Sequence, residues 1–290
     1  MDSVSERRLW DLPHDERVGV VRNEVGRVAA RLADLDADLL DRPAVGDWAI
    51  RDVIAHLVVV AEFYTDSINR GASGEVAVSG DRPAPGTGRG AIVAAGIRQR
   101  AAEVAAGFDN TVIDRFRHSA LVLADTLDAE ESSLEFECYH PGGIIAANRF
   151  VVLYLKELGL HEWDMFEALQ PPCEMSRWAV DAALQAMEEE LASGSLRWVT
   201  DPDASPDTLT LRVITSGDVA IERDLLLEPA QTRLVAVDRQ RNVDSGLALD
   251  AADFVLGCSG RRDLLAVVAE GRGEGDPDGL GVLVRRLTGM

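Results

Sequence analysis

Two histidines and one glutamate of this chain lie inside apolar, helix-patterned segments, where ionisable side chains are uncommon. Glu157 and His161 are four residues apart in LYLKELGLHEWDM, so on a helix they share one face, one turn apart. His56 lies within a second apolar run, IRDVIAHLVVVAEF. If these helices face each other, one carboxylate and two imidazoles supply three ligands for a tetrahedral divalent cation, with zinc the first choice. The fourth position then stays open to water or substrate, as in catalytic zinc sites.

A structural role for the same residues fits the spacing as well. A histidine in an apolar helix is often a buried, hydrogen-bonded residue, and a glutamate four residues before a histidine occurs by chance. Two details raise the case for a metal without deciding between the two roles. The chain has only five histidines, two of them in its most apolar helices, and burying an imidazole without a partner is costly. Asp164 follows His161 by three residues, so its carboxylate is placed to accept a hydrogen bond from a metal-bound imidazole.

The elements that must position these residues are predicted to be helices throughout the first half of the chain. Apolar residues recur there at the three-to-four spacing of amphipathic helices. The predicted helices cover residues 17–35, residues 47–70 with Asp47 as N-cap, residues 91–127 with a break near 107–110, and residues 144–169 before Pro171 and Pro172. The Gly/Pro/Ser-rich segment 71–90 predicts a long mobile loop. Four long helices indicate an antiparallel four-helix bundle.

The second half changes character and predicts an α+β domain, because short strand-like runs stand beside separate helices. The predicted elements of this half are a helix over 176–191, a turn-rich linker at 201–207, strands over 208–214, 224–228 and 233–238, and helices over 251–256, 261–269 and 279–287. A strand-like or irregular patch at 132–143 belongs to the first half, before its fourth helix. We therefore expect a metal-binding four-helix bundle over residues 1–172 and an α+β domain over residues 173–290.

The composition excludes several classes of partner. The net charge is −21 and the pI is near 4.6, so a nucleic acid or an anionic membrane surface would be repelled. We find neither a signal peptide nor an apolar run long enough to span a membrane. Cys138, Cys173 and Cys258 are widely spaced and are expected to be free thiols in a reducing compartment. The expected location is the cytoplasm, and the expected state is a monomer or a small homo-oligomer.

These residues also carry a family resemblance. The segment VGDWAIRDVIAHL resembles the W-x-x-x-D-x-x-x-H-L signature of the DinB-like, mycothiol-dependent maleylpyruvate isomerase family, and ELGLHEWDMFEAL resembles its E-x-x-x-H-x-W-D helix. The resemblance implies that His56, Glu157 and His161 are the three protein ligands of a zinc ion in a four-helix bundle. More loosely, the segment from ALDAADFVLGCSGRRDLL onward is similar to a family domain that resembles sterol carrier protein 2.

The resemblance implies thiol chemistry with mycothiol, a low-molecular-weight thiol of actinobacteria, acting on a small electrophilic substrate. A metal deprotonates a coordinating thiol at neutral pH and makes it a nucleophile. In an isomerase the thiolate would add to a conjugated double bond, allow rotation and leave; in an S-transferase it would stay. Arg261 matches an arginine that binds a substrate carboxylate in the isomerase, a task that suits a guanidinium, although Arg262 beside it leaves the match uncertain by one residue.

Other interpretations stay open at this point. His140, in CYHPGG, has no counterpart in the family pattern and is either a general acid or base or an ordinary loop histidine. Trp48 is interpreted as a packing residue. The function could also be that of a thiol-independent metalloenzyme of bacterial secondary metabolism built on the same bundle, or that of a non-enzymatic binding module.

Overall fold

The computed structural model describes residues 7–76, 90–107, 111–128, 131–193, 207–229 and 231–287. These residues form two compact units, one over Arg7–Ala182 and one within Ala183–Met290. The predicted fold class is confirmed, because the first unit is helical and the second contains a sheet. Most of the loop predicted at 71–90 and of the linker predicted at 201–207 lies outside the described residues. None of the described helices is both long and apolar enough to cross a membrane.

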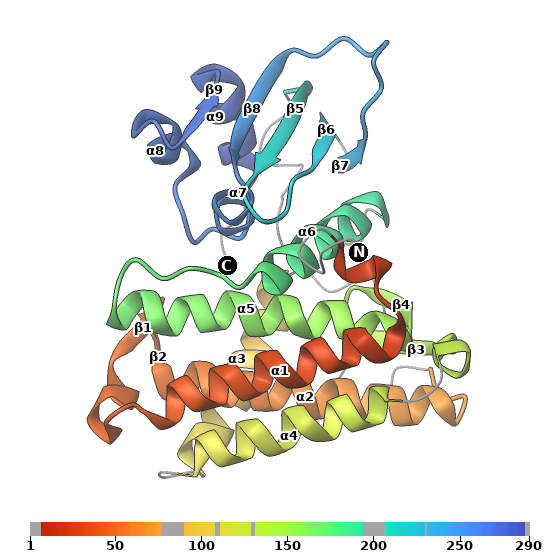
Figure 1. Cartoon of the computed structure of the whole chain (residues 1–290), viewed down its shortest axis with the longest axis vertical. Coiled ribbons are helices and arrows are strands. Elements are labelled where there is room, and N and C mark those ends of the chain that lie inside the picture. The colour runs from red at the N-terminus through yellow and green to blue at the C-terminus, as the bar shows by residue number, and fades with distance from the viewer. Residues whose placement is uncertain are drawn as a thin grey trace. The chain divides into compact units, whose positions relative to one another are not determined.

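The first unit is built around four helices that lie side by side, α1, α2, α4 and α5 (Figure 1). The α-helices that begin in this unit are α1 (His14–Ala33), α2 (Ile50–Ala72), α3 (Gly90–Ala106), α4 (Val112–Leu127), α5 (Phe150–Leu169) and α6 (Arg177–Ser193). Its short elements are β1 (Pro43–Val45), β2 (Trp48–Ala49), β3 (Glu137–His140) and β4 (Gly143–Ala146), with the 3-10 helices η2 (Leu9–Asp11), η3 (Ala37–Asp41), η4 (Glu131–Leu134) and η5 (Ala147–Arg149). The segment predicted as one helix over 91–127 is therefore two helices, separated at the predicted break.

The predicted start of the second helix is wrong. Asp47 is not its N-cap, because it lies in the turn between the antiparallel strands β1 and β2, and the helix begins only at Ile50. The first turn of α2 is capped instead by Asp52, whose Oδ2 accepts a hydrogen bond of 2.9 Å from the backbone N–H of Ala49. A carboxylate at the third helical position satisfies an N–H group that has no partner within the helix.

The predicted start of the fourth helix is also wrong. Residues 143–146 form β4, which pairs antiparallel with β3 in a hairpin, and α5 begins at Phe150. The strand-like character predicted for the preceding patch is confirmed by β3. The apolar residues at 144–145 had suggested an earlier helix start because short apolar runs do not distinguish strand from helix. The predicted end of the helix at Leu169 is confirmed.

Helix α5 is held on two sides by close contacts. The buried carboxylate of Glu162 pairs with the guanidinium groups of Arg27 and Arg31 on α1. On another side, Gly159 lies so close to α6 that an added Cβ would stand 2.1 Å from the Cβ of Ala179. These contacts fix the rotation of α5, and with it the direction of every side chain that α5 presents to α2.

The second unit is a five-stranded sheet with helices. The strand order is β7-β6-β5-β8-β9, in which β5 and β8 are parallel and the other neighbours antiparallel. The strands are β5 (Leu209–Ser216), β6 (Glu222–Glu228), β7 (Gln231–Ala236), β8 (Ser245–Asp250) and β9 (Gly273–Gly275). Alternate residues of β5, Leu211 and Val213, are completely buried, the pattern of a sheet with one face on a core. Three strands were predicted; β8 and β9 were missed.

The three helices of the second unit each begin after an aspartate. Asp250, Asp263 and Asp276 accept backbone N–H hydrogen bonds in the first turn of the helix that follows, which is the preferred chemistry of an N-cap. The helices are α7 (Ala251–Cys258), α8 (Leu264–Ala269) and α9 (Pro277–Arg286). All three were predicted, but α8 begins three residues later than expected because Asp263 caps it.

Candidate metal centre

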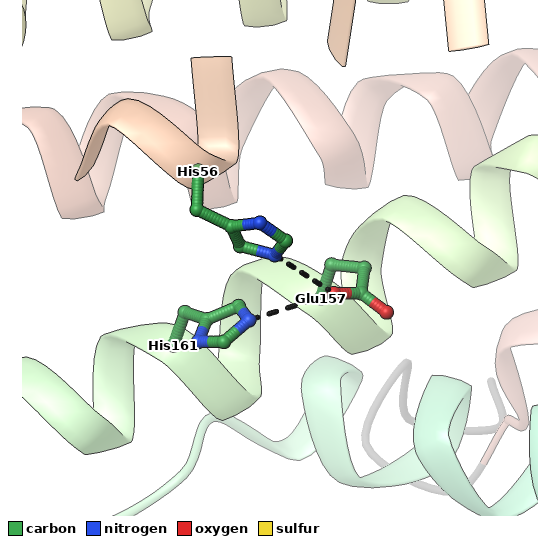
Figure 2. Close-up of side chains that lie close together, drawn as sticks. All are labelled: His56, Glu157 and His161. Atoms are coloured by element: carbon green, nitrogen blue, oxygen red, sulfur yellow. Dashed lines mark hydrogen bonds and ion pairs between the residues drawn. The ribbon is translucent and has the colours of Figure 1, made fainter. Parts of the chain in front are cut away.

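Helices α2 and α5 bring together the three residues that the sequence predicts as metal ligands. His56 projects from α2, and Glu157 and His161 project from α5 one turn apart, with both imidazoles directed at the carboxylate (Figure 2). Nε2 of His56 lies 3.4 Å from Oε2 of Glu157, and Nε2 of His161 lies 3.5 Å from the same oxygen. One ligand atom from each residue lies within 4.8 Å of those from the other two. Both histidines are buried, and Glu157 is partly exposed.

These separations fit a shared cation better than direct hydrogen bonds. A good N–H···O hydrogen bond is about 2.7–3.2 Å long, shorter than either contact. Zinc bonds of about 2.0–2.1 Å at tetrahedral angles place neighbouring ligand atoms roughly 3.3–3.4 Å apart, close to the 3.4 Å and 3.5 Å observed. The donor set of two imidazoles and one carboxylate is also the set that zinc accepts in catalytic sites.

A fourth residue orients His161. Asp164 lies one turn further along α5 and is buried, and its Oδ2 is 2.8 Å from Nδ1 of His161. The carboxylate accepts a hydrogen bond from Nδ1–H, so a neutral imidazole carries its lone pair on Nε2, the nitrogen that faces Glu157. A metal-binding histidine commonly has such a carboxylate partner on its other nitrogen. The contact predicted between these two residues is confirmed.

Glu157 is ionised at neutral pH. Burial raises the pKa of its carboxyl group, but the adjacent imidazoles of His161 and His56 and the positive charge of Lys156 outweigh burial and hold the pKa well below its usual range. The Lys156 ammonium lies 3.7 Å from Oε1 of Glu157, whereas both histidines face Oε2. The two oxygens of one carboxylate therefore face a cation on one side and two imidazoles on the other.

Trp48 packs against both histidines from β2. Its ring centroid is 5.2 Å from that of His56 and 6.4 Å from that of His161, and it lies nearly parallel to the His161 ring. The indole therefore covers the two imidazoles with an apolar surface. Such a cover lowers the local dielectric and strengthens electrostatic interactions at the centre.

His140 lies at the end of β3, beside aromatic side chains of the same bundle. Its ring is 6.0 Å from that of Tyr64 and 6.3 Å from that of Phe150. Nδ1 accepts a hydrogen bond from the backbone N–H of Gly142 at 3.1 Å, so the proton of the neutral ring is on Nε2. Burial, together with the charge of Lys156, lowers the pKa of His140 to about 4. His140 is thus a neutral hydrogen-bond donor near pH 7, not a residue that titrates there.

Arg261 belongs to the second unit, in the segment between α7 and α8. Its Nη1 donates to the carbonyl oxygen of Ser259 at 3.2 Å. Arg262 instead pairs with the buried carboxylate of Asp253, which also receives Arg272. Arg262 therefore has a structural ion pair. Arg261 remains the residue predicted to bind a substrate carboxylate.

The three cysteines are buried free thiols, as predicted. Burial raises the pKa of Cys138 to about 11 and that of Cys258 to about 12, and it also raises the pKa of Cys173. A protonated, buried thiol is a poor nucleophile and a poor metal ligand. Thiol chemistry at this centre would therefore need a thiol that enters from solution.

One functional candidate was missed from the sequence. Lys156 is the only lysine among the 29 lysines and arginines of the chain, and it directly precedes a candidate metal ligand. That Lys156 is the only lysine was visible in the sequence. The direction of its side chain was not, because neighbouring residues on a helix point about 100° apart.

Comparison with protein families shows the family of this chain. A family model described as the mycothiol maleylpyruvate isomerase N-terminal domain matches residues 21–166, which include His56, Glu157 and His161. A search of curated proteins found no match.

Two solved structures are similar in fold. A crystal structure of the mycothiol-dependent maleylpyruvate isomerase is 15% identical over 88% of this chain and 92% of that chain, with a TM-score of 0.59. A structure of the same enzyme with one histidine replaced by alanine is 14% identical over 94% of this chain and 96% of that chain, with a TM-score of 0.61. At such low identity these structures establish the fold of both units and nothing finer.

Proposed function

The chain belongs to the family of the mycothiol maleylpyruvate isomerase N-terminal domain, and from this premise we propose that it is a metal-dependent enzyme that uses mycothiol. The reaction is an isomerisation or an S-transfer on a small electrophilic substrate. The proposed metal ligands are His56, Glu157 and His161, and the proposed metal is zinc.

One observation carries the proposal more than any other. Two imidazole nitrogens meet one carboxylate oxygen at 3.4 Å and 3.5 Å, and for His161 the hydrogen bond to Asp164 leaves a lone pair on the nitrogen that faces the carboxylate. A lone pair opposite a carboxylate is repulsive without a cation between them. This arrangement supports a cation between the three residues, and three protein ligands suit a catalytic site with one open position.

The residues around the centre have separate tasks. Asp164 holds the His161 proton on Nδ1, and the half-buried Trp48 ring packs against the two imidazoles. A divalent cation bound there would lower the pKa of a coordinated thiol, so that the thiol is a thiolate at neutral pH. Because the buried cysteines of this chain are protonated, the nucleophile is assigned to mycothiol.

The test is metal content and thiol binding in matched variants. Wild-type protein, His161→Ala and the control His118→Ala are purified, their zinc is measured by mass spectrometry, and mycothiol is titrated calorimetrically. His118 is an exposed histidine of α4. About one zinc per chain in wild type and control, lost in His161→Ala together with thiol binding, is expected.

The other outcomes separate the alternatives. Zinc without thiol binding would favour the thiol-independent metalloenzyme. No zinc in any sample after reconstitution would refute the metal centre and favour a binding module.

A further inference from the structure

His140 is the last residue of β3, at the tight turn that joins β3 to β4. Strand pairing matches His140 with Gly143, so Pro141 and Gly142 form the turn between them. Nδ1 of His140 accepts the backbone N–H of Gly142 at 3.1 Å, so the turn itself orients the ring and places its proton on Nε2. A neutral histidine held in this way presents a single N–H group, which can only donate.

The Nε2–H group of His140 has no acceptor among the described residues. Solvent reaches this group, because the residue is only half-buried and the nitrogen is not sealed off. A second donor of the same aromatic cluster, Oη of Tyr154 on α5, also makes no hydrogen bond with a described residue, but it is completely buried. Both rings pack against that of Tyr64, at 6.0 Å and 6.5 Å. Of the two donors, only that of His140 is open to a ligand.

This donor belongs to the surroundings of the candidate metal centre. Phe150, whose ring is 6.3 Å from that of His140, precedes Glu157 by seven residues on α5, or about 10 Å along the helix axis. The charges of Lys156 and Glu157 both act on His140. These two are also the only residues of α5 between Phe150 and Phe166 that are not buried. His140 therefore shares its electrostatic surroundings with the solvent-accessible part of α5, where Glu157 lies.

A neutral imidazole suits one step of the proposed reaction. When a thiolate adds to a conjugated carbonyl compound, sulfur bonds to the β-carbon and the electron pair of the double bond moves to the carbonyl oxygen, which becomes an enolate. A hydrogen-bond donor at that oxygen stabilises the charge as it forms. Because His140 is neutral near pH 7, it can donate to the oxygen without losing its proton. In an isomerisation the electron pair then returns and the thiolate leaves.

We propose that His140 is a catalytic residue whose Nε2–H group binds the carbonyl oxygen of an α,β-unsaturated carbonyl substrate and stabilises the enolate that forms when the thiolate adds. The proposal rests on the proposed function and deepens it, because it names the substrate class and a residue that acts on the substrate. The oxygen concerned is that of the conjugated carbonyl group. The hydroxyl of Tyr154 takes no part, because it is sealed from the substrate.

Steady-state kinetics of zinc-loaded protein with mycothiol and cyclohexenone, a conjugated ketone, test this role. His140→Phe keeps a ring in the aromatic cluster and removes the donor, so kcat should fall by about 100-fold or more. His140→Gln supplies a neutral N–H donor and should recover part of that loss. The controls are Tyr154→Phe, which removes the buried donor, and His118→Phe, at an exposed position of α4. Both controls should keep the wild-type kcat, and every variant should keep its zinc and its mycothiol affinity.

Nitrogen NMR supplies a second measurement that does not depend on turnover. In zinc-loaded protein made with isotope-labelled histidine, the five histidines give signals, and those of His140 are identified by their absence from His140→Phe. The ligand is cyclohexanone, which has the carbonyl oxygen but no double bond to accept a thiolate. Cyclohexene, which lacks the oxygen, is the control. Cyclohexanone should shift the Nε2 signal of His140 saturably, and cyclohexene should not.

Several kinetic results would overturn the proposal: no turnover of cyclohexenone by wild-type protein that binds zinc and mycothiol, an unchanged kcat in His140→Phe, or a His140→Gln protein no faster than His140→Phe. An equal loss in Tyr154→Phe would assign the effect to packing of the cluster, and a loss of zinc in His140→Phe would make His140 a support of the metal centre; either would overturn it too. So would a His140 signal on which cyclohexanone and cyclohexene act alike. Failure of the proposed function has a different signature, because wild type then binds no zinc or no mycothiol.

Discussion

Replacement of Asp164 by asparagine tests the logic of the metal centre with almost no change of shape. Oδ2 of Asp164 accepts the Nδ1–H of His161 at 2.8 Å, and the residue is buried, with 2% of its surface exposed. Asparagine keeps an acceptor oxygen and the same volume, so the His161 tautomer is retained. The change removes the negative charge that makes the imidazole a stronger ligand.

The size of the effect follows from two independent arguments. Loss of a carboxylate partner behind a metal-binding histidine typically weakens metal affinity about 10- to 100-fold, or about 1.4–2.7 kcal/mol. A hydrogen bond to a charged group contributes roughly 1.5–3 kcal/mol. Because the two ranges overlap, we expect the zinc dissociation constant of Asp164→Asn to rise by about 10- to 100-fold.

The assay is a zinc competition titration against a chromophoric chelator at neutral pH. The matched control is Asp181→Asn, another buried carboxylate of the same unit, which accepts hydrogen bonds from Arg8 Nε at 2.6 Å and from the backbone N–H of Leu9 at 2.5 Å. The control should lower the free energy of unfolding and leave zinc affinity unchanged. An Asp164→Asn protein that is folded and binds zinc as tightly as wild type would refute the assignment of His161 as a ligand oriented by Asp164.

Three further outcomes are expected. Gly159→Ala should lower the free energy of unfolding by about 1–3 kcal/mol, because its new Cβ meets that of Ala179. The control Gly26→Ala, whose new Cβ has nothing within 4 Å, should not lower it. Urea unfolding that ranks the two variants the other way would contradict the tight contact of α5 with α6. Because burial lowers the pKa of His140 from 6.5 to about 4, the unfolded chain binds a proton in this window that the folded chain does not. Stability should therefore fall as pH drops from 6.5 towards 4, by about 3 kcal/mol in all, and His140→Gln should remove that part of the pH dependence of urea unfolding. Arg261→Ala should raise the KM for a carboxylate substrate while zinc content stays constant; an unchanged KM would exclude it from substrate binding.

The local part of the metal centre was determined by the sequence alone. Glu157 and His161 share a face because a helix repeats every 3.6 residues, and the same geometry places Asp164 beside His161. The end of α5 was equally local, since prolines follow it. The starts of α2 and α5 were not predictable in this way, because extended segments before each helix pair with another strand, and such pairing depends on residues outside the local window.

Only the tertiary structure decided which distant groups meet. His56 stands 101 residues before Glu157, and their contact depends on how α2 and α5 pack, which the ion pairs of Glu162 and the close approach at Gly159 help to fix. The tertiary structure likewise decided that the ammonium of Lys156 lies over the far oxygen of Glu157, and that Arg262 rather than Arg261 pairs with Asp253. Residue types and spacing specify which chemistry is available, because helix geometry is local; packing specifies where it is assembled, because the contacts involved are between segments far apart in the chain.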